Sequence, residues 1–419
     1  MTVFDPQHAP RVNTPEIALP PRPHPVTLAH IIKEEAEAID IAHELAEEFG
    51  KDAALRDREG FLPVNELDRF SQSGLWGITV PQAYGGAQLS YVTVAEVIKI
   101  ISAVDPSIGQ IPHNHLAIVE NIALEGSEEQ KRFFFGEVLR GLRLGNAMAE
   151  AGSRTVLEIQ TKIVADGDDY IVNGKKFYST GALLSHYVAI VAKNEQGLPC
   201  FAFVDRAEPG LTIINDWACF GQRTTASGTV LIDNIKVPAS RVMRARWSGL
   251  PPTPGGPINQ IITGAIDLGI AKGAIAELID FVRTKTRPWI DSGANAASEE
   301  PFTIAAVGDL EIRLHAAEAI TERAGRLIDR ALAEPSEAAV AEASIATAEA
   351  KVLSTEISLL ATNKLFELAG TRATLNSYAL DRHWRNARTH TLHDPVRWKY
   401  FHVGNYYLNG VNPPSSAYL

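Results

Sequence analysis

The sequence predicts an α+β protein in which a helical part, a β-rich part and a second helical part follow one another along the chain. Apolar residues recur at helical spacing over 27–50, strand-forming residues dominate 163–237, and Ala, Leu, Ile and Glu return with helical period over 258–369. At 419 residues the chain is long enough for two or three domains. We expect an extended arm over 1–26, a helical domain over 27–145, a β-barrel domain over 146–245 and a helical bundle with a tail over 246–419.

The N-terminal part begins with a proline-rich arm. Seven prolines fall within the first 25 residues, which favours an extended segment that lies on the surface or reaches a neighbouring subunit. An amphipathic helix then ends near Gly50. Further helices are expected over 63–73, 90–104, 115–125 and 127–139.

The middle part has the pattern of a small β-barrel or sandwich. Strand residues over 163–177 surround Asn173-Gly174, a pair that favours a two-residue hairpin turn. Gly, Pro and Asp residues bound the other expected strands, over 187–192, 200–204, 210–214 and 229–237.

The C-terminal part predicts a bundle. The helical pattern over 258–369 has one Pro/Gly/Ser-rich break, at 288–301, and is long enough for four long helices. Its longest apolar stretch, 261–279, is interrupted by Asp267 and Lys272, so we do not expect it to span a bilayer.

Charge and composition narrow the function classes. A net charge of -11 argues against nucleic-acid binding, which needs a basic surface to neutralise phosphates. The N-terminus lacks a secretory signal pattern, and two cysteines in the whole chain fit a reducing compartment, so we expect a soluble, cytoplasmic protein. No Gly-x-Gly-x-x-Gly fingerprint for a nicotinamide cofactor and no P-loop is present.

The segment from Ala387 to Pro395 is the strongest candidate for chemistry. It places His390 and His393 three residues apart, followed by Asp394. Histidine takes and gives protons near neutral pH, and residues at this spacing share one face of a helix or turn. The segment by itself is also compatible with hydrogen-bonded core histidines, a helix end or a metal site.

Several motifs together resemble the acyl-CoA dehydrogenase superfamily. The resemblance covers nearly the whole chain after residue 27 and implies an N-terminal helical domain, a central β-barrel and a C-terminal four-helix bundle, with flavin between barrel and bundle and usually a homotetramer. The segments that carry it are Gly74–Pro81 with Tyr84-Gly85-Gly86, Asn173–Phe177, and Gly221–Gly228 continuing to Pro238.

Two departures from the dehydrogenases stand out. The carboxylate base near the C-terminus is replaced by the His390–His393 segment, and its alternative place, within 234–266, holds no Asp or Glu. Without a base the dehydrogenation has no proton acceptor. The Arg-x-Gln-Phe-Gly segment with which the dehydrogenases bind the adenine half of FAD is also missing. Arg283 and its basic neighbours stand there instead and favour FMN over FAD, unless they form only a basic surface loop.

These departures resemble the flavin-dependent monooxygenases of the dibenzothiophene monooxygenase and sulfur-acquisition type. The matching segments are Arg385–Pro395, Leu408-Asn409-Gly410, Phe177–Gly181 and Gly145-Asn146-Ala147. Such enzymes take reduced FMN from a separate NAD(P)H-dependent flavin reductase and, through a C4a-hydroperoxyflavin, oxygenate an organosulfur compound.

The resemblance also implies roles for individual residues. His393 would be the acid/base with His390 beside it, Ser179 would hydrogen-bond the flavin near N5, and Asn146 would orient oxygen or substrate. Residues expected to contact the flavin are Phe177, Ser179, Thr180, Arg283, Gly370 and Arg372; those expected in the substrate pocket are His115 and Trp217; no metal is expected. Each also has a structural reading, as a turn, helix-end or core residue.

Three alternative functions are also compatible with the sequence. An amine-oxidising monooxygenase of the same fold would use similar chemistry. An FAD-dependent acyl-CoA dehydrogenase would need a carboxylate from elsewhere in the chain. A flavin-free binding homologue would not bind added FMN.

Overall fold

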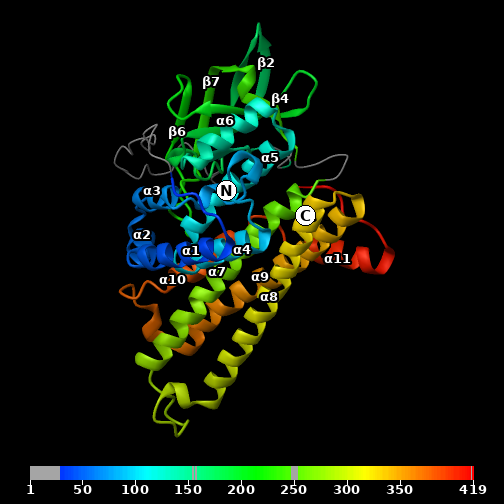
Figure 1. The fold of residues 1–419 in the computed structure, drawn as a ribbon. Coiled ribbons are helices and arrows are strands. Elements are labelled where there is room, and N and C mark those ends of the chain that lie inside the picture. Colours follow the sequence, from blue (N-terminus) through cyan, green and yellow to red (C-terminus); the bar gives the residue numbers. More distant parts are fainter. Residues whose placement is uncertain (1–28, 153–154, 156–157, 247–252, 417) are drawn as a thin grey trace, which may run out of the picture. The chain divides into compact units, whose positions relative to one another are not determined.

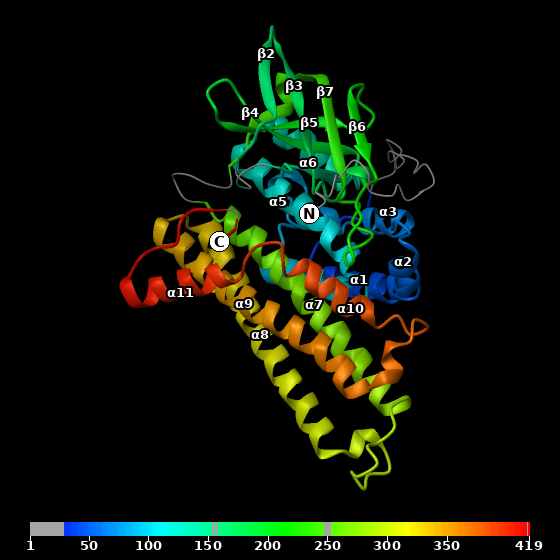
Figure 2. The same cartoon turned by 180° about the vertical axis from the view of Figure 1, so that it is seen from behind.

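The computed structural model describes residues 29–152, 155, 158–246, 253–416 and 418–419. The arm expected over 1–26 lies outside them. The described chain forms two compact units: a sheet unit made of Leu144–Ala218 and Ala226–Val242, and a helical unit made of the chain up to Arg143, Cys219–Thr225 and Met243–Leu419. Figures 1 and 2 show the elements of each unit.

The helices expected over 63–73, 90–104 and 127–139 are confirmed within two residues of their ends, whereas the first helix, whose pattern began at 27, starts only at Glu35. Short polar residues cap several of them, as Ser90 does for α4 and Ser127 for α6. The helices are α1 (Glu35–Gly50), α2 (Ala53–Glu59), α3 (Val64–Gln72), α4 (Tyr91–Val104), α5 (Pro106–Glu125), α6 (Glu128–Leu139), α7 (Gly255–Thr284), α8 (Pro301–Ala333), α9 (Glu337–Ala369), α10 (Asp381–His390) and α11 (Arg397–Asn409).

Helix α5 begins at Pro106, well before the start expected at 115. The Asp105 side chain accepts hydrogen bonds from the backbone N–H groups of Ser107 and Ile108, and Pro106 occupies the first turn, where its missing N–H costs nothing. Pro112 lies inside the helix. The longer helix brings Gln110 and His113 onto a regular element.

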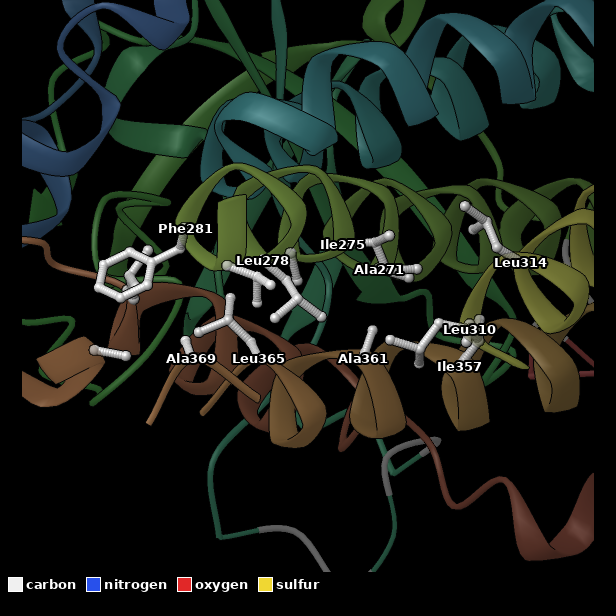
Figure 3. Packing of buried hydrophobic residues seen from close by; sticks show 14 of the residues in the cluster. Ala271, Ile275, Leu278, Phe281, Leu310, Leu314, Ile357, Ala361, Leu365 and Ala369 are labelled. Atoms are coloured by element: carbon white, nitrogen blue, oxygen red, sulfur yellow. The ribbon is translucent and has the colours of Figure 1, made fainter. Parts of the chain in front are cut away.

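Three long helices, rather than the four expected, account for 258–369, because α8 and α9 each run for 33 residues. Helices α7, α8 and α9 lie side by side, and α10 and α11 pack on α9 (Figures 1 and 2). Each large apolar side chain buried in this bundle contributes about 1.5–3 kcal/mol. Figure 3 shows the α7 residues Ala271, Ile275, Leu278 and Phe281 opposite the α9 residues Ile357, Ala361, Leu365 and Ala369.

Glycines allow two close approaches in the helical unit. A Cβ on Gly273 of α7 would meet the Ala103 carbonyl oxygen of α4 at 2.0 Å. A Cβ on Gly221 would meet the Arg385 carbonyl oxygen of α10, also at 2.0 Å. The segment Cys219–Thr225 therefore packs directly against α10. There the Asn386 side-chain oxygen accepts a hydrogen bond from the Gln222 backbone N–H at 2.6 Å.

The sheet unit contains the strands expected from the sequence. They hydrogen-bond in the order β6-β7-β3-β2-β4-β5, and β1 pairs with β4 in parallel. Alternate apolar residues of these strands, such as Val188, Ile190 and Val230, form its core. The strands are β1 (Leu144–Ala147), β2 (Lys162–Asp166), β3 (Asp169–Lys176), β4 (Tyr187–Lys193), β5 (Pro199–Asp205), β6 (Leu211–Ile214), β7 (Thr229–Pro238) and β8 (Val242–Arg244).

The hairpin turn expected at Asn173-Gly174 is wrong. Strand β3 runs through both residues, and the turn that joins it to β2 is at Gly167, whose φ is +63°. The register between β3 and β7 shifts between Val172 and Gly174, so the Asn-Gly pair sits at a bulge. A Cβ on Gly174 would meet the Thr161 side chain at 2.3 Å, which gives a packing reason for the glycine.

Among the described residues, no helix has the length and apolar character needed to cross a membrane.

The contact between segment 219–225 and α10 can be tested by Gly221→Ala. A methyl group there must displace backbone, so we expect the variant to lose about 2 kcal/mol of unfolding free energy or more, seen as a lower thermal midpoint. Gly308→Ala is the matched control, because a Cβ at this exposed position of α8 meets nothing within 4 Å. The control should be neutral or gain up to about 1 kcal/mol. Equal midpoints for the two variants would contradict the close approach.

Candidate active site

The end of α10 meets three other helices of the helical unit around one buried carboxylate. Asp267, in α7, is fully buried. Its Oδ1 lies 2.5 Å from His390 Nδ1, while its Oδ2 lies 2.7 Å from Lys351 Nζ and accepts from the Thr355 hydroxyl at 3.0 Å. Burial alone would raise the pKa of Asp267, but the Lys351 and His390 charges outweigh it and lower that pKa well below its usual value.

Gln110, in α5, continues this network to His393. Its Oε1 lies 2.7 Å from His390 Nε2, and its Nε2 lies 3.2 Å from His393 Nε2. The result is a chain of four side chains, Asp267–His390–Gln110–His393. The two histidine rings themselves do not hydrogen-bond, since their centroids are 5.5 Å apart.

The two histidines have different surroundings. His390 is 1% exposed, whereas the His393 side chain is accessible. The dense protein around His393 disfavours its charged form. Together with the positive charges of His390 and Lys351, and of His113 at a pH low enough to protonate it, it lowers the pKa of His393 well below its usual value. His393 is therefore the reachable, neutral end of the chain.

His113 adds a third ring to the cluster. It is 2% exposed, its Nε2 donates to Asn259 Oδ1 at 2.6 Å, and its ring centroid lies 6.1 Å from that of His393. Burial lowers the pKa of His113 to about 4, so this ring is neutral at pH 7. Its Nδ1 has no hydrogen-bond partner among the described residues.

This arrangement is suited to handling protons at His393 and unsuited to a carboxylate base. Both oxygens of Asp267 are occupied by donors, and its pKa is lowered, so the carboxylate is a weak proton acceptor. Among the described residues, no group of three or more His, Cys, Asp or Glu side chains is placed to hold a metal ion.

In the sheet unit, the turn after β3 holds Ser179. Ser179 is fully buried, and its hydroxyl has no hydrogen-bond partner among the described residues. Asn146 shapes this turn: its Nδ2 donates to the Tyr178 carbonyl at 3.1 Å, and its Oδ1 accepts from the Met148 N–H at 3.0 Å. The Thr180 hydroxyl lies 2.8 Å from that of Ser227. Asn146 and Thr180 thus stabilise the turn, while the Ser179 hydroxyl takes no part in these hydrogen bonds.

Three aromatic rings lie beside this turn. Phe177 lies 4.7 Å from Tyr178 and 6.3 Å from Trp217, between ring centroids. Tyr178 is 52% exposed and adopts a left-handed conformation with a φ of +58°, which is strained for a bulky residue. Phe177 and Trp217 are only partly buried, so these rings form an accessible wall rather than core.

The remaining expected residues do not join the histidine cluster. His115 is fully buried, and its Nε2 donates to the Trp76 carbonyl at 2.9 Å while its ring packs on the indole, so the structure places it in the core. Arg283 is exposed at the last turn of α7, 16 residues from Asp267, a separation of about 24 Å along the helix axis.

Gly370 and Arg372 lie near that same end of α7. Gly370 ends α9 with a φ of +74°, and Arg372 is exposed. Arg372 donates to the Tyr378 hydroxyl at 3.0 Å and to the Lys285 carbonyl at 3.4 Å.

Sequence reasoning missed Gln110, Asp267 and Lys351 as site residues. Asp267 and Lys351 are charged residues within long Ala/Ile-rich helices, and a charge on a buried helix face was the signal that could have found them. Gln110 gave no such signal, because it is uncharged and lies before 115, where the helix was expected to begin.

Comparison with known proteins gives three matches that together cover most of the chain. Residues 33–142 match the acyl-CoA dehydrogenase N-terminal domain, residues 146–235 its middle domain and residues 261–398 its C-terminal domain.

Individual relatives cover about nine tenths of the chain. The dibenzothiophene monooxygenase of Mycolicibacterium goodii is 33% identical, over 90% of this chain and 95% of its own length. The probable FMNH2-dependent monooxygenase SfnC of Pseudomonas putida is 31% identical, over 91% and 97%. The crystal structure of FMN-bound TdsC from Paenibacillus sp. A11-2 superposes with a TM-score of 0.86 at 30% identity, over 91% of this chain and 100% of that one.

These relatives confirm the resemblance first drawn from the His390–His393 and Phe177–Gly181 segments. The chain belongs to the acyl-CoA dehydrogenase family, on the branch that contains the dibenzothiophene monooxygenases.

Proposed function

We propose that the protein is an FMNH2-dependent monooxygenase that uses reduced FMN and O2 to oxygenate a small organosulfur compound of the sulfide, sulfone or thiophene class. The observation that carries the proposal is the accessible, neutral His393 at the end of a chain whose carboxylate, Asp267, is fully engaged. This set can donate and accept a proton at His393 but offers no carboxylate base for dehydrogenation. The relatives named for dibenzothiophene and for FMNH2 support the choice of substrate and cofactor.

The residues of the sheet unit fit a flavin. A buried hydroxyl without a partner costs free energy, and Ser179 would recover it by hydrogen-bonding a bound cofactor. Phe177, Tyr178 and Trp217 offer flat apolar surface for a planar ring. When bound, reduced FMN supplies the electrons that activate O2 for transfer of one oxygen atom to the substrate.

The histidines would then supply and accept the protons of the reaction. His393 would hold a proton toward the reacting groups, and His390 would keep the His393 ring in place through Gln110. Asn146 would hold the Ser179 turn through the Tyr178 carbonyl. Because the sequence has no nicotinamide fingerprint, a separate flavin reductase would supply reduced FMN. The low cysteine content favours a cytoplasmic enzyme.

We also propose a homotetramer. Large apolar side chains are exposed on α8, including Phe302 at 87% and Ile312 at 70%, and on α11, including Leu408 at 84%. Arg283 and Arg372 would bind the phosphate of a flavin held by another copy, because they lie far along the bundle from His393.

The function is tested by supplying photoreduced FMN and O2 with a panel of sulfides, sulfones, thiophenes and amines. We expect oxygenated sulfur products from the protein as it stands. His393→Ala should fold normally, lose product formation by about 10²- to 10⁴-fold and release hydrogen peroxide instead. His315→Ala, at an exposed position of α8, is the matched control. Unchanged turnover in His393→Ala would remove that residue from the mechanism. Oxidation of amines alone, or reduction of bound FAD by an acyl-CoA, would overturn the sulfur assignment.

Ser179→Ala separates a ligand contact from a structural one. Removing a buried hydroxyl without a partner should leave the thermal midpoint of the flavin-free protein unchanged or raise it. The same change should weaken the binding of reduced FMN by up to about 10-fold in an anaerobic titration, because one hydrogen bond is lost. Thr180→Ala, which removes the hydrogen bond between Thr180 and Ser227, should instead lower the midpoint. An unaltered FMN affinity in Ser179→Ala would exclude Ser179 from the flavin site.

The oligomer is tested by light scattering. We expect the mass of four 45.5 kDa chains. Leu408→Glu and Ile312→Glu should lower that mass by placing charges in apolar interfaces. Leu198→Glu, the same kind of change at a 52% exposed residue of the turn between β4 and β5, should not. A monomer at micromolar concentration would contradict the tetramer.

A further inference from the structure

The Gln110 side chain is bonded on both sides by the histidines and has a chemistry that neither of them has. It is 3% exposed, with Oε1 at 2.7 Å from His390 Nε2 and Nε2 at 3.2 Å from His393 Nε2. An amide oxygen only accepts hydrogen bonds, an amide nitrogen only donates them, and the group does not titrate near neutral pH. Gln110 can therefore only accept a hydrogen bond on the His390 side and only donate one on the His393 side.

The contact with Asp267 determines which nitrogen atoms of His390 carry protons. Its carboxylate can only accept, so His390 Nδ1 carries a proton. His390 Nε2 faces the amide oxygen and must carry a second proton, which makes His390 an imidazolium beside Asp267. The Gln110 amide nitrogen donates to His393 Nε2, so that atom is an acceptor and the single proton of a neutral His393 is on Nδ1.

We propose that Gln110 is a positioning residue that assigns opposite roles to the two histidines, holding His390 as the buried cation and His393 as a neutral ring with its Nδ1 proton available to the reacting groups. This inference rests on the proposed function for its catalytic meaning. A donor at His393, with a cation behind it, suits an oxygen atom on which negative charge develops.

Most of the other titratable groups around His393 act in the same direction. Lys351 of α9 and His390 of α10 disfavour a second proton on the ring, as does His113 of α5 once it is protonated, and Asp267 of α7 opposes them only partly. The Gln110 hydrogen bond adds to this effect because it is made to the lone pair of Nε2, which exists only while that nitrogen is unprotonated. Loss of the amide should therefore raise the pKa of His393.

The test is histidine hydrogen–deuterium exchange at the imidazole C2 position, followed by mass spectrometry over a pH series on the flavin-free protein. Cleavage after Leu392 separates His390 from His393. In Gln110→Leu, we expect the exchange midpoint of His393 to rise by about half to one pH unit. Gln110→Glu, which keeps the shape of the side chain, should raise it further, because a carboxylate accepts from both rings. Gln196→Leu, the same change at an exposed turn, should leave it unaltered.

With substrate and reduced FMN, both Gln110 variants should divert oxygen to hydrogen peroxide. A purely structural role for Gln110 would lower the thermal midpoint without moving the His393 exchange midpoint, and that result would overturn the proposal. If Gln110→Leu does not fold, an unmoved midpoint in Gln110→Glu overturns it equally. Because exchange is measured without flavin, a failure of the proposed function would show separately, as absence of oxygenated product from the unmodified protein.

Discussion

The buried carboxylate of Asp267 is the interaction on which the rest of the site depends. A charge in a helical core is tolerated only when it is paired and fully hydrogen-bonded, and Asp267 meets this condition through Lys351, Thr355 and His390. These partners come from α9 and α10. The need to pair the Asp267 carboxylate therefore fixes the position of two helices against α7. Segment 219–225 can then approach α10 closely only because Gly221 has no side chain.

The same carboxylate explains how a dehydrogenase-like fold can support a different reaction. A free carboxylate in an apolar site would be a strong base, because burial raises its pKa. Lys351 and His390 reverse that effect at Asp267 and make it a permanent anion. Its role is then to stabilise a cation rather than to take a proton. In the mechanism that we propose, proton chemistry moves to His393, which is accessible and less basic than an ordinary histidine.

The fold could be predicted from the sequence wherever a periodic pattern was long, as in α4, α7 and the strands β4 and β7. The prediction was wrong where a local sequence pattern is compatible with two different structures. Asn173-Gly174 favours a turn, yet pairing of β3 with both β2 and β7 makes a bulge the better solution. The helix expected from 115 begins at Pro106, because that proline fits the first turn of α5 and Pro112 is accommodated inside it.

For the site, the sequence supplied the residues that are close together along the chain and missed those that only the fold brings together. His390, His393 and Ser179 were visible in short motifs, whereas Asp267, Lys351 and Gln110 lie between 84 and 283 residues from the side chains they contact. The histidines of α5 show what the helix boundary adds: two residues apart, they point to different surroundings, so His113 faces the cluster while His115 packs on Trp76. Helical periodicity, applied to the correct helix boundary, is what distinguishes them.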